Sequence, residues 1–275
     1  MKVTLIQYDN DALELLLFTK QTRLRMTEKG LDEIRAWSDE KKMAELEYML
    51  GTIQSSWEFA SYTFMIEDVS RAFTHQLVRH RVGVAFAQQS QRAVDMTGFD
   101  YVTGPNIEQS GSFDQRAPIE GAEVIYDTVM DQINSGYQTL IQLGVPPQDA
   151  RGVLPTNICT NIVFKANLRT LHEMALKRLC VKTQGEFQDV FRAIREAVLV
   201  VHPWADRMIR VHCAVTGTCC FPSFPVAQCS VKRIVYDPKT RQAYGGGLAG
   251  SLEEIQTHWQ QHRDEAQVRI PRSED

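Results

Sequence analysis

The sequence lacks the short motifs that mark several common active sites. It contains no G-x-S-x-G nucleophile elbow, no H-E-x-x-H zinc motif and no P-loop. No cysteine has a histidine at a spacing typical of a catalytic pair, since His212 and Cys213 are neighbours whose side chains are expected to point apart. A protein nucleophile is therefore not evident, and a bound cofactor would have to carry demanding chemistry.

The sequence also lacks long apolar runs and an excess of positive charge. No stretch approaches the length of a membrane span, and MKVTLIQYDND has no signal-peptide pattern, so a cytoplasmic protein is expected. The net charge of −4 and a pI near 6.0 disfavour a general binder of nucleic acids or membranes. Any anion site must be local. With 275 residues, 43% of them hydrophobic, the chain can bury a sizeable core.

The six cysteines include no C-x-x-C pair, and four of them lie between Cys213 and Cys229. Without a secretion signal, free thiols are expected rather than disulfides. A zinc site is conceivable in this cluster, but the missing C-x-x-C pair favours free thiols, and no metal is expected.

The pattern of apolar residues mixes strands and helices. Alternation predicts a strand over residues 2–8, and aromatic and β-branched residues predict another over 59–66. The apolar run at 158–164 fits either a strand or a helix. Helices are predicted over 12–18, over 31–50 in one or two pieces, from Ser70 to Arg79, from 125 to Gly144, over 167–179 and over 187–200.

The tail has a pattern of its own. Beyond Val231 the sequence predicts a hairpin, a glycine linker at Gly245–Gly247 and a final helix capped by Ser251 with Glu254. Two units are therefore predicted, a catalytic domain over residues 1–230 and an extension over 231–275.

The most unusual stretch is QLVRHRVGVAFAQQSQR, residues 76–92. Arg79, His80 and Arg81 are adjacent, and a mostly apolar spacer follows them. Adjacent cations repel one another, whereas guanidinium groups match phosphate oxygens in pairs. The apolar flanks predict that the segment is largely buried, and buried arginines need partners. Two other places in the chain are also basic, Arg151 and the group Arg169, Lys177 and Arg178. Together with the R-H-R segment, these residues are expected to converge on a phosphorylated ligand.

These residues resemble the signature of the flavin-dependent thymidylate synthases (ThyX), in which R-H-R, a spacer and S-x-R follow one another. EFASYTFMIEDVSRAFTHQLVRHR resembles the strand and helix before that signature. ARGVLP resembles the second family motif, NLRTLHEMALKRL the third, and TQGEF the segment after it. The resemblance spans roughly residues 2–203. It implies a ThyX-like α+β fold, with an antiparallel sheet, flanking helices and a homotetramer whose subunits share active sites.

The resemblance also implies a reaction, in which FAD moves a one-carbon unit from methylenetetrahydrofolate to C5 of dUMP, with NADPH as reductant. The residues implied to contact FAD are Arg79, His80, Arg81, Gln88, Asn167 and Arg169. Those implied to bind the nucleotide, mainly through its phosphate, are Gln76, Ser90, Arg92 and Arg151.

Arg178 is the implied catalytic residue and also contacts the substrate. Its guanidinium would stabilise the anionic pyrimidine ring and so activate C5. Simpler roles stay open for three of these residues: Asn167 as a helix cap, Arg151 as the partner of Asp149, and Arg178 as an exposed helix cation.

The sequence departs from the family pattern around the signature. The spacer Val82–Gln89 has eight residues where seven are usual, Ala93 replaces a tyrosine, and Gln54 and Phe59 replace histidines. These changes lie where nucleotide, folate and flavin would meet. Two alternatives to thymidylate synthase therefore stay open. One is a flavin- and folate-dependent 5-hydroxymethylase of dCMP or dUMP, and the other is a non-catalytic nucleotide-binding relative.

Overall fold

The computed structural model describes residues 1–21, 28–52, 54–104, 107, 121–216, 218–221, 223 and 229. The predictions for the tail, namely the hairpin from Val231, the linker at Gly245–Gly247 and the helix capped by Ser251, lie outside these residues. Within the described part, no helix is long and apolar enough to cross a membrane.

A four-stranded antiparallel sheet forms the centre of the molecule, in the order β1-β2-β4-β3. Its strands are β1 (Lys2–Tyr8), β2 (Ser61–Ser70), β3 (Val84–Gln88) and β4 (Cys159–Asn167). The apolar run at 158–164 is thus part of a strand, and the α+β class is confirmed.

Two features of the sheet differ from the prediction. The second strand begins at Ser61 rather than Phe59, because Gln54–Phe59 form the 3₁₀ turn η1, and it runs on to Ser70. Strand β3 occupies the spacer of the signature, which showed no strand pattern. It pairs with β4 alone, as an edge strand.

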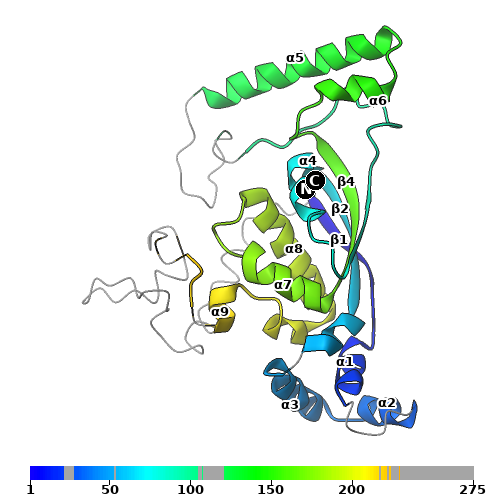
Figure 1. The fold of residues 1–275 in the computed structure, drawn as a ribbon, viewed down its shortest axis with the longest axis vertical. Coiled ribbons are helices and arrows are strands. Elements are labelled where there is room, and N and C mark those ends of the chain that lie inside the picture. Colours follow the sequence, from blue (N-terminus) through cyan, green and yellow to red (C-terminus); the bar gives the residue numbers. More distant parts are fainter. Residues whose placement is uncertain are drawn as a thin grey trace, which may run out of the picture.

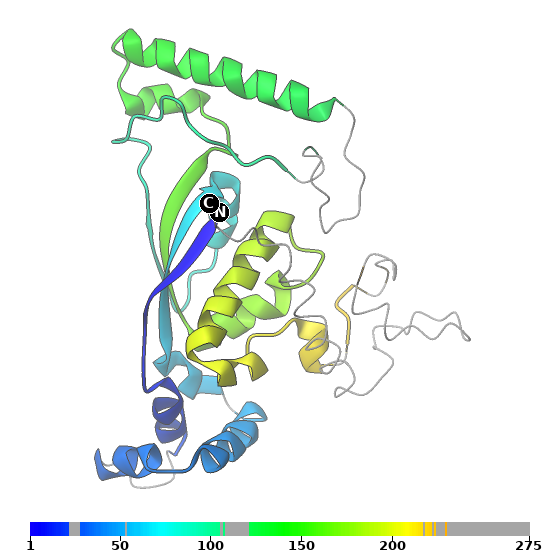
Figure 2. The same ribbon diagram turned by 180° about the vertical axis from the view of Figure 1, so that it is seen from behind.

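Helices α4 (Arg71–Leu77), α7 (Leu168–Arg178) and α8 (Gly185–Val201) lie together on one face of the sheet (Figure 1, and from behind in Figure 2). The strands turn their buried aromatic residues toward them. Phe164 of β4 stacks with Phe64 of β2 and Phe86 of β3, at centroid distances of 6.1 and 5.4 Å. This layer of helix on sheet is the main core.

Further helices extend the molecule at both ends of the sheet (Figure 1). At one end lie α1 (Ala12–Lys20), α2 (Glu28–Arg35) and α3 (Asp39–Leu50), so the predicted helix over 31–50 is in two pieces. Asp11 precedes α1 but makes no capping hydrogen bond, because its carboxylate pairs with Arg35 at 2.8 Å.

At the other end, α5 (Ala122–Gln142) and the short α6 (Pro147–Ala150) stand away from the helix layer (Figure 2). The long helix is confirmed and is followed by Gly144 with a φ of +86°. Its apolar residues are divided between the core and the surface. Met130 and Tyr137 are buried, whereas Val124 and Ile125 are about 70% exposed.

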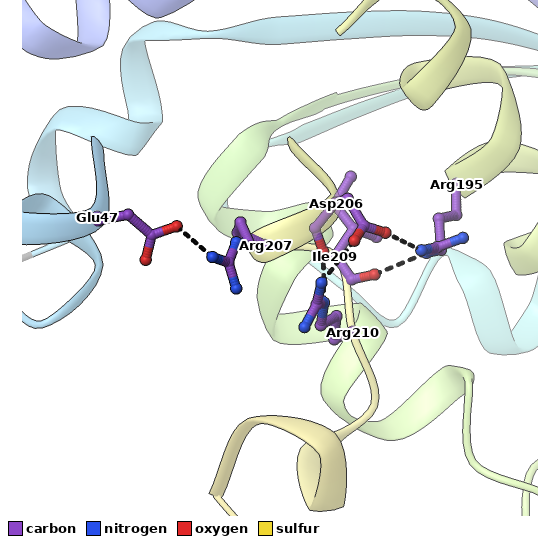
Figure 3. Close-up of polar contacts among 6 residues, drawn as sticks. All are labelled: Glu47, Arg195, Asp206, Arg207, Ile209 and Arg210. Atoms are coloured by element: carbon purple, nitrogen blue, oxygen red, sulfur yellow. Dashed lines mark hydrogen bonds and ion pairs between the residues drawn. The ribbon is translucent and has the colours of Figure 1, made fainter. Parts of the chain in front are cut away.

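The chain continues through the short turn η2 (Arg151–Val153) before β4, and through η3 (Pro203–Arg207) and α9 (His212–Thr216) after α8. Asp206 of η3 lies between two buried arginines, Arg195 of α8 and Arg210 (Figure 3). Arg195 also donates to the carbonyl of Ile209 at 2.9 Å. This ionic cluster fixes the chain after α8 to the helix layer.

Candidate functional site

Helix α4 carries Gln76 and leads directly into the R-H-R segment, which holds three more of the predicted site residues. Ser70 caps the helix by accepting a hydrogen bond from the Phe73 amide at 3.0 Å, as predicted. The amide and hydroxyl of Ser70 both donate to Glu186 in the first turn of α8. Burial raises the pKa of the Glu186 carboxyl, and these bonds from Ser70 oppose the rise. The starts of α4 and α8 are thereby locked together.

The R-H-R segment follows α4 and lies nearer the surface than predicted. Arg79 and Arg81 are exposed, and Val82 is 83% exposed, so the prediction of a largely buried segment is wrong. The helix ends at Leu77, and the chain then turns outward to reach the edge strand β3. Of the three R-H-R residues, only His80 is half-buried.

The turn after R-H-R is fixed to the start of α7. Gly83 has a φ of +68°, and its carbonyl accepts from the Asn167 amide at 3.1 Å. The Thr170 hydroxyl donates to the carbonyl of Val82 at 3.0 Å. A Cβ on Gly83 would lie 2.3 Å from the Thr170 oxygen, so only glycine fits.

Asn167 acts as the cap of α7, because its side-chain oxygen accepts from the Thr170 amide at 2.9 Å. The capping role that the sequence left open is therefore confirmed. The cap occupies the oxygen of the side-chain amide and leaves its NH₂ group as a donor beside Gly83.

Arg178 lies at the opposite end of α7 and is half-buried rather than exposed. Its guanidinium carbon is 4.2 Å from the centre of the Phe187 ring. Burial, followed by the charge of Arg79, lowers the pKa of this guanidinium. The Nε of Arg178 is buried and has no hydrogen-bond partner among the described residues.

His80 lies close to Arg178 and forms a basic cluster with it. Burial lowers the pKa of its imidazole, and the charges of Arg178 and Lys177 lower it further, so the ring is neutral at pH 7. Its Nε2 is also buried without a partner in the described structure. Buried polar atoms are rarely left unpaired. Two such atoms in one basic cluster fit a site that a polar ligand completes.

The two predicted glutamines are attached to the same framework. Gln88 donates to Thr74 of α4 at 3.0 Å and lies 3.4 Å from the hydroxyl of Thr160. Gln76 donates to Gln184, the residue before α8, at 2.6 Å. Both amides are therefore held by side chains on the helix side of the sheet.

The remaining signature residues have fewer contacts. Ser90 and Arg92 are exposed after β3, where the Ser90 hydroxyl accepts from the Arg92 amide at 3.2 Å. Arg169 is in ion pairs with Glu58 at 2.6 Å and Glu173 at 3.2 Å, which raise its pKa. The structure thus places Arg169 among carboxylates rather than among the other arginines.

Arg151 lies beside an arginine that the sequence did not single out. Its Nε donates to the carbonyl of Gln148, and within the described residues it forms no ion pair with Asp149. Burial and the nearby charge of Arg151 lower the pKa of Arg71, in the first turn of α4. Neither Arg71 nor Arg151 forms an ion pair with a carboxylate among the described residues. The sequence feature that could have identified Arg71 as a site residue is its position directly after the helix cap Ser70.

The cysteines show no sign of chemistry. All six are unpaired, and no three side chains of His, Cys, Asp or Glu in the described residues are arranged to hold a metal ion. Burial raises the pKa of the Cys213 thiol to about 12 and that of Cys159 to about 11. These thiols are protonated at neutral pH and are poor nucleophiles.

Comparison with known proteins places this framework in a family. The family model described as thymidylate synthase complementing protein matches residues 4–204. A relative from Sulfurisphaera tokodaii is 33% identical over 220 residues, which are 78% of this chain and 80% of the relative. One from Geobacter sulfurreducens is 33% identical over 224 residues, 80% of this chain and 90% of the relative. Both carry the name flavin-dependent thymidylate synthase. The family inferred from the R-H-R and S-x-R pattern is confirmed: the chain belongs to the thymidylate synthase complementing protein family.

Proposed function

We propose that this protein is a flavin-dependent thymidylate synthase, which transfers a one-carbon unit from methylenetetrahydrofolate to C5 of dUMP to form dTMP, with NADPH as reductant. The observation that carries the proposal is the basic cluster formed by His80, just after α4, and Arg178, at the end of α7. There the half-buried Arg178 and the neutral His80 each have a buried nitrogen without a partner in the described structure. Family membership supports the same reaction.

The residues around the R-H-R turn fit FAD. The exposed Arg79 and Arg81 have no ion pair among the described residues, and two guanidiniums match a pyrophosphate. The unpaired Nε2 of His80 and the free NH₂ group of Asn167 add groups that can hydrogen-bond to a flavin. FAD, when bound there, would supply the redox chemistry of the one-carbon transfer.

Two other residues complete the proposed flavin site in different ways. Gln88 is already held in place by Thr74. Arg169 would have to exchange Glu58 or Glu173 for the cofactor, because both of its ion pairs are short.

The nucleotide phosphate is proposed to bind between Arg71 and Arg151. Two arginines that repel one another and lack a carboxylate partner in the described residues gain from a shared anion. Gln76, Ser90 and Arg92 are proposed to contribute further donors. Ser90 orients the nucleotide and does not attack it, since its oxygen accepts a backbone hydrogen bond and none of the described residues is paired with it as a base.

Arg178 is proposed to act on the pyrimidine ring. Negative charge must build up on the ring for C5 to attack the one-carbon unit. A half-buried guanidinium stabilises that charge more strongly than one in water, because water screens it less. The Nε–H without a described partner is available for this contact.

A homotetramer with shared sites is part of the proposal, as is the division into residues 1–230 and 231–275. Met65 and Val163 alternate with the buried Phe64 and Phe164, so they lie on the sheet face away from α4, α7 and α8, and both are partly exposed. The exposed Val124 and Ile125 of α5 add apolar surface that a second subunit can cover. Light scattering of the purified protein tests the assembly, and a monomer at working concentration would contradict it.

A product assay tests the reaction. The protein is reconstituted with FAD and incubated with methylenetetrahydrofolate and either dUMP or dCMP, with and without NADPH, and the nucleotides are identified by mass. A methylated product from dUMP that requires NADPH supports the proposal. A hydroxymethylated product formed without net reduction would instead favour the hydroxymethylase, for which the eight-residue spacer and Ala93 are the specific observation. A protein that retains no flavin would contradict both.

Replacing Arg178 tests its role. Arg178→Ala is expected to lower kcat about 100-fold or more, as loss of one preorganised donor to a developing charge does. Flavin absorbance should persist, because Arg178 is assigned to the substrate. Arg35→Ala removes an exposed arginine of α2 and serves as the control. Equal activity of the two variants would exclude the role.

A further inference from the structure

Phe187 lies directly against the proposed catalytic arginine. The guanidinium carbon of Arg178 is 4.2 Å from the centre of the Phe187 ring, and the ring is fully buried. The ring in turn meets Phe73 of α4 edge-on, with centroids 4.9 Å apart and planes at 67°. Arg178 therefore rests on an aromatic ring that is itself held by a second one.

We propose that Phe187 is a positioning residue, which fixes the orientation of Arg178 for the pyrimidine ring. This inference rests on the proposed function of Arg178. The face of an aromatic ring attracts a cation without taking a hydrogen bond from it. Phe187 thus offsets part of the cost of burying the guanidinium and leaves its N–H donors free for the ligand. An acidic partner would hold Arg178 equally well but would neutralise the charge that the reaction needs.

The ring can do this because α8 is joined to α7 and α4 around it. Gln188, the next residue, is buried and donates to the carbonyl of Leu179 at 3.0 Å, immediately after Arg178. On the other side of Phe187, Glu186 accepts from the amide of Ser70 at 2.6 Å. The platform and the cation therefore sit on elements that are bonded to each other within a few residues of the contact.

The test compares two phenylalanines of α8. Phe187→Leu removes the ring under Arg178, and Phe187→Tyr keeps a ring. Phe191→Leu is the matched control, because Phe191 is also fully buried, four residues further along α8, and its ring has no cation over it in the described structure. Phe187→Met, whose unbranched side chain can adapt to the vacated space, is the second variant if the leucine variant does not fold.

Two measurements are made on each variant. The first is the rate at which phenylglyoxal modifies Arg178, followed by mass spectrometry of the peptide. The second is kcat and KM for dUMP. Phe187→Leu should expose Arg178 to the reagent several-fold faster and lower kcat about tenfold, as expected for loss of a partly desolvated cation–π contact. Phe187→Tyr should keep both the labelling rate and kcat close to those of the unchanged protein. Phe191→Leu should change neither quantity as much as Phe187→Leu does.

The outcomes separate this inference from the proposed function. If Phe187→Leu and Phe191→Leu behave alike in both measurements, Phe187 has only a packing role and the inference is wrong. If the tyrosine variant is no better than the leucine variant, the ring itself is not responsible, and the inference is again wrong. The labelling rate needs no turnover, so faster modification of Arg178 in a protein without dUMP activity would uphold the contact while rejecting the proposed reaction.

Discussion

Gly83 is the residue whose replacement most directly tests how the R-H-R turn is held. Gly83→Ala places a Cβ 2.3 Å from the Thr170 oxygen and 2.6 Å from the side-chain nitrogen of Asn167. The left-handed backbone, with φ at +68°, costs an alanine about 1–2 kcal/mol. The clash can be relieved only if the turn moves away from α7.

The cost of that movement can be bounded from the bonds it breaks. The turn is attached through the carbonyls of Val82 and Gly83, and each hydrogen bond contributes about 1 kcal/mol. We therefore expect Gly83→Ala to lower the free energy of unfolding by about 3 kcal/mol if the turn stays folded. If the turn detaches instead, the loss stays near 2 kcal/mol, and the turn becomes accessible to protease.

The control is Gly98→Ala, because Gly98 has nearly the same φ, +71°, and no atom within 4 Å of the added carbon. It should lose only the same backbone cost of about 1–2 kcal/mol. Urea unfolding measures both variants, and flavin absorbance after gel filtration measures cofactor retention, which should fall for Gly83→Ala alone. Equal stability and equal flavin retention in the two variants would refute the assignment of the turn as a fixed part of the cofactor site.

Three further predictions concern charge and protonation. Asp206→Asn leaves two buried arginines without their carboxylate (Figure 3) and should cost about 3–5 kcal/mol in urea unfolding, whereas Glu47→Gln, at a half-exposed pair, should cost less than about 1 kcal/mol. Burial lowers the pKa of His172 and His202, so the unfolded chain binds protons first as the pH falls. The stability that the two neutral histidines contribute is therefore fully present above the ordinary histidine pKa of about 6.5 and is lost as the pH falls below it. A urea midpoint that is unchanged between pH 7.5 and 5.5 would contradict this. Arg71→Ala should raise KM for dUMP about tenfold with unchanged flavin content, and an unaltered KM would remove Arg71 from the phosphate site.

Sequence reasoning succeeded where local interactions decide the structure. The caps at Ser70 and Asn167 were predictable, because a capping side chain binds an amide three residues later in its own chain. The long helix α5 was likewise predictable from its four-residue apolar spacing. In each case the pattern and the partner lie within a few residues of each other.

The prediction failed where the partner is distant in the chain. Strand β3 contains Ala85 and Ala87 on one side and is only five residues long, so its existence depends on pairing with β4, more than seventy residues away. The apolar residues around R-H-R suggested burial, but an edge strand leaves one side of the segment open, and Val82 is exposed. The meeting of Arg71 with Arg151 depends in the same way on two elements that sequence order does not bring together.

The pairing of β3 also limits where the extra residue that the resemblance implies for the signature spacer can lie. Val84–Gln88 pair with β4 in continuous register, from Val84 opposite Ala166 to Gln88 opposite Ile162, without a bulge. An extra residue inside a paired strand would turn the following side chains to the opposite face. Gln88 nevertheless faces the helix layer, where it bonds Thr74.

The strand therefore keeps its alternation, and the insertion must be absorbed at one of its ends. One end is the left-handed turn at Gly83, which Asn167 and Thr170 hold against α7. The other is Gln89, whose amide and side chain both bond Asn161 of β4, at 3.0 and 3.1 Å. A change at the Gly83 end would alter the proposed flavin contacts of R-H-R, whereas a change at Gln89 would alter the proposed approach of Ser90 and Arg92 to the nucleotide.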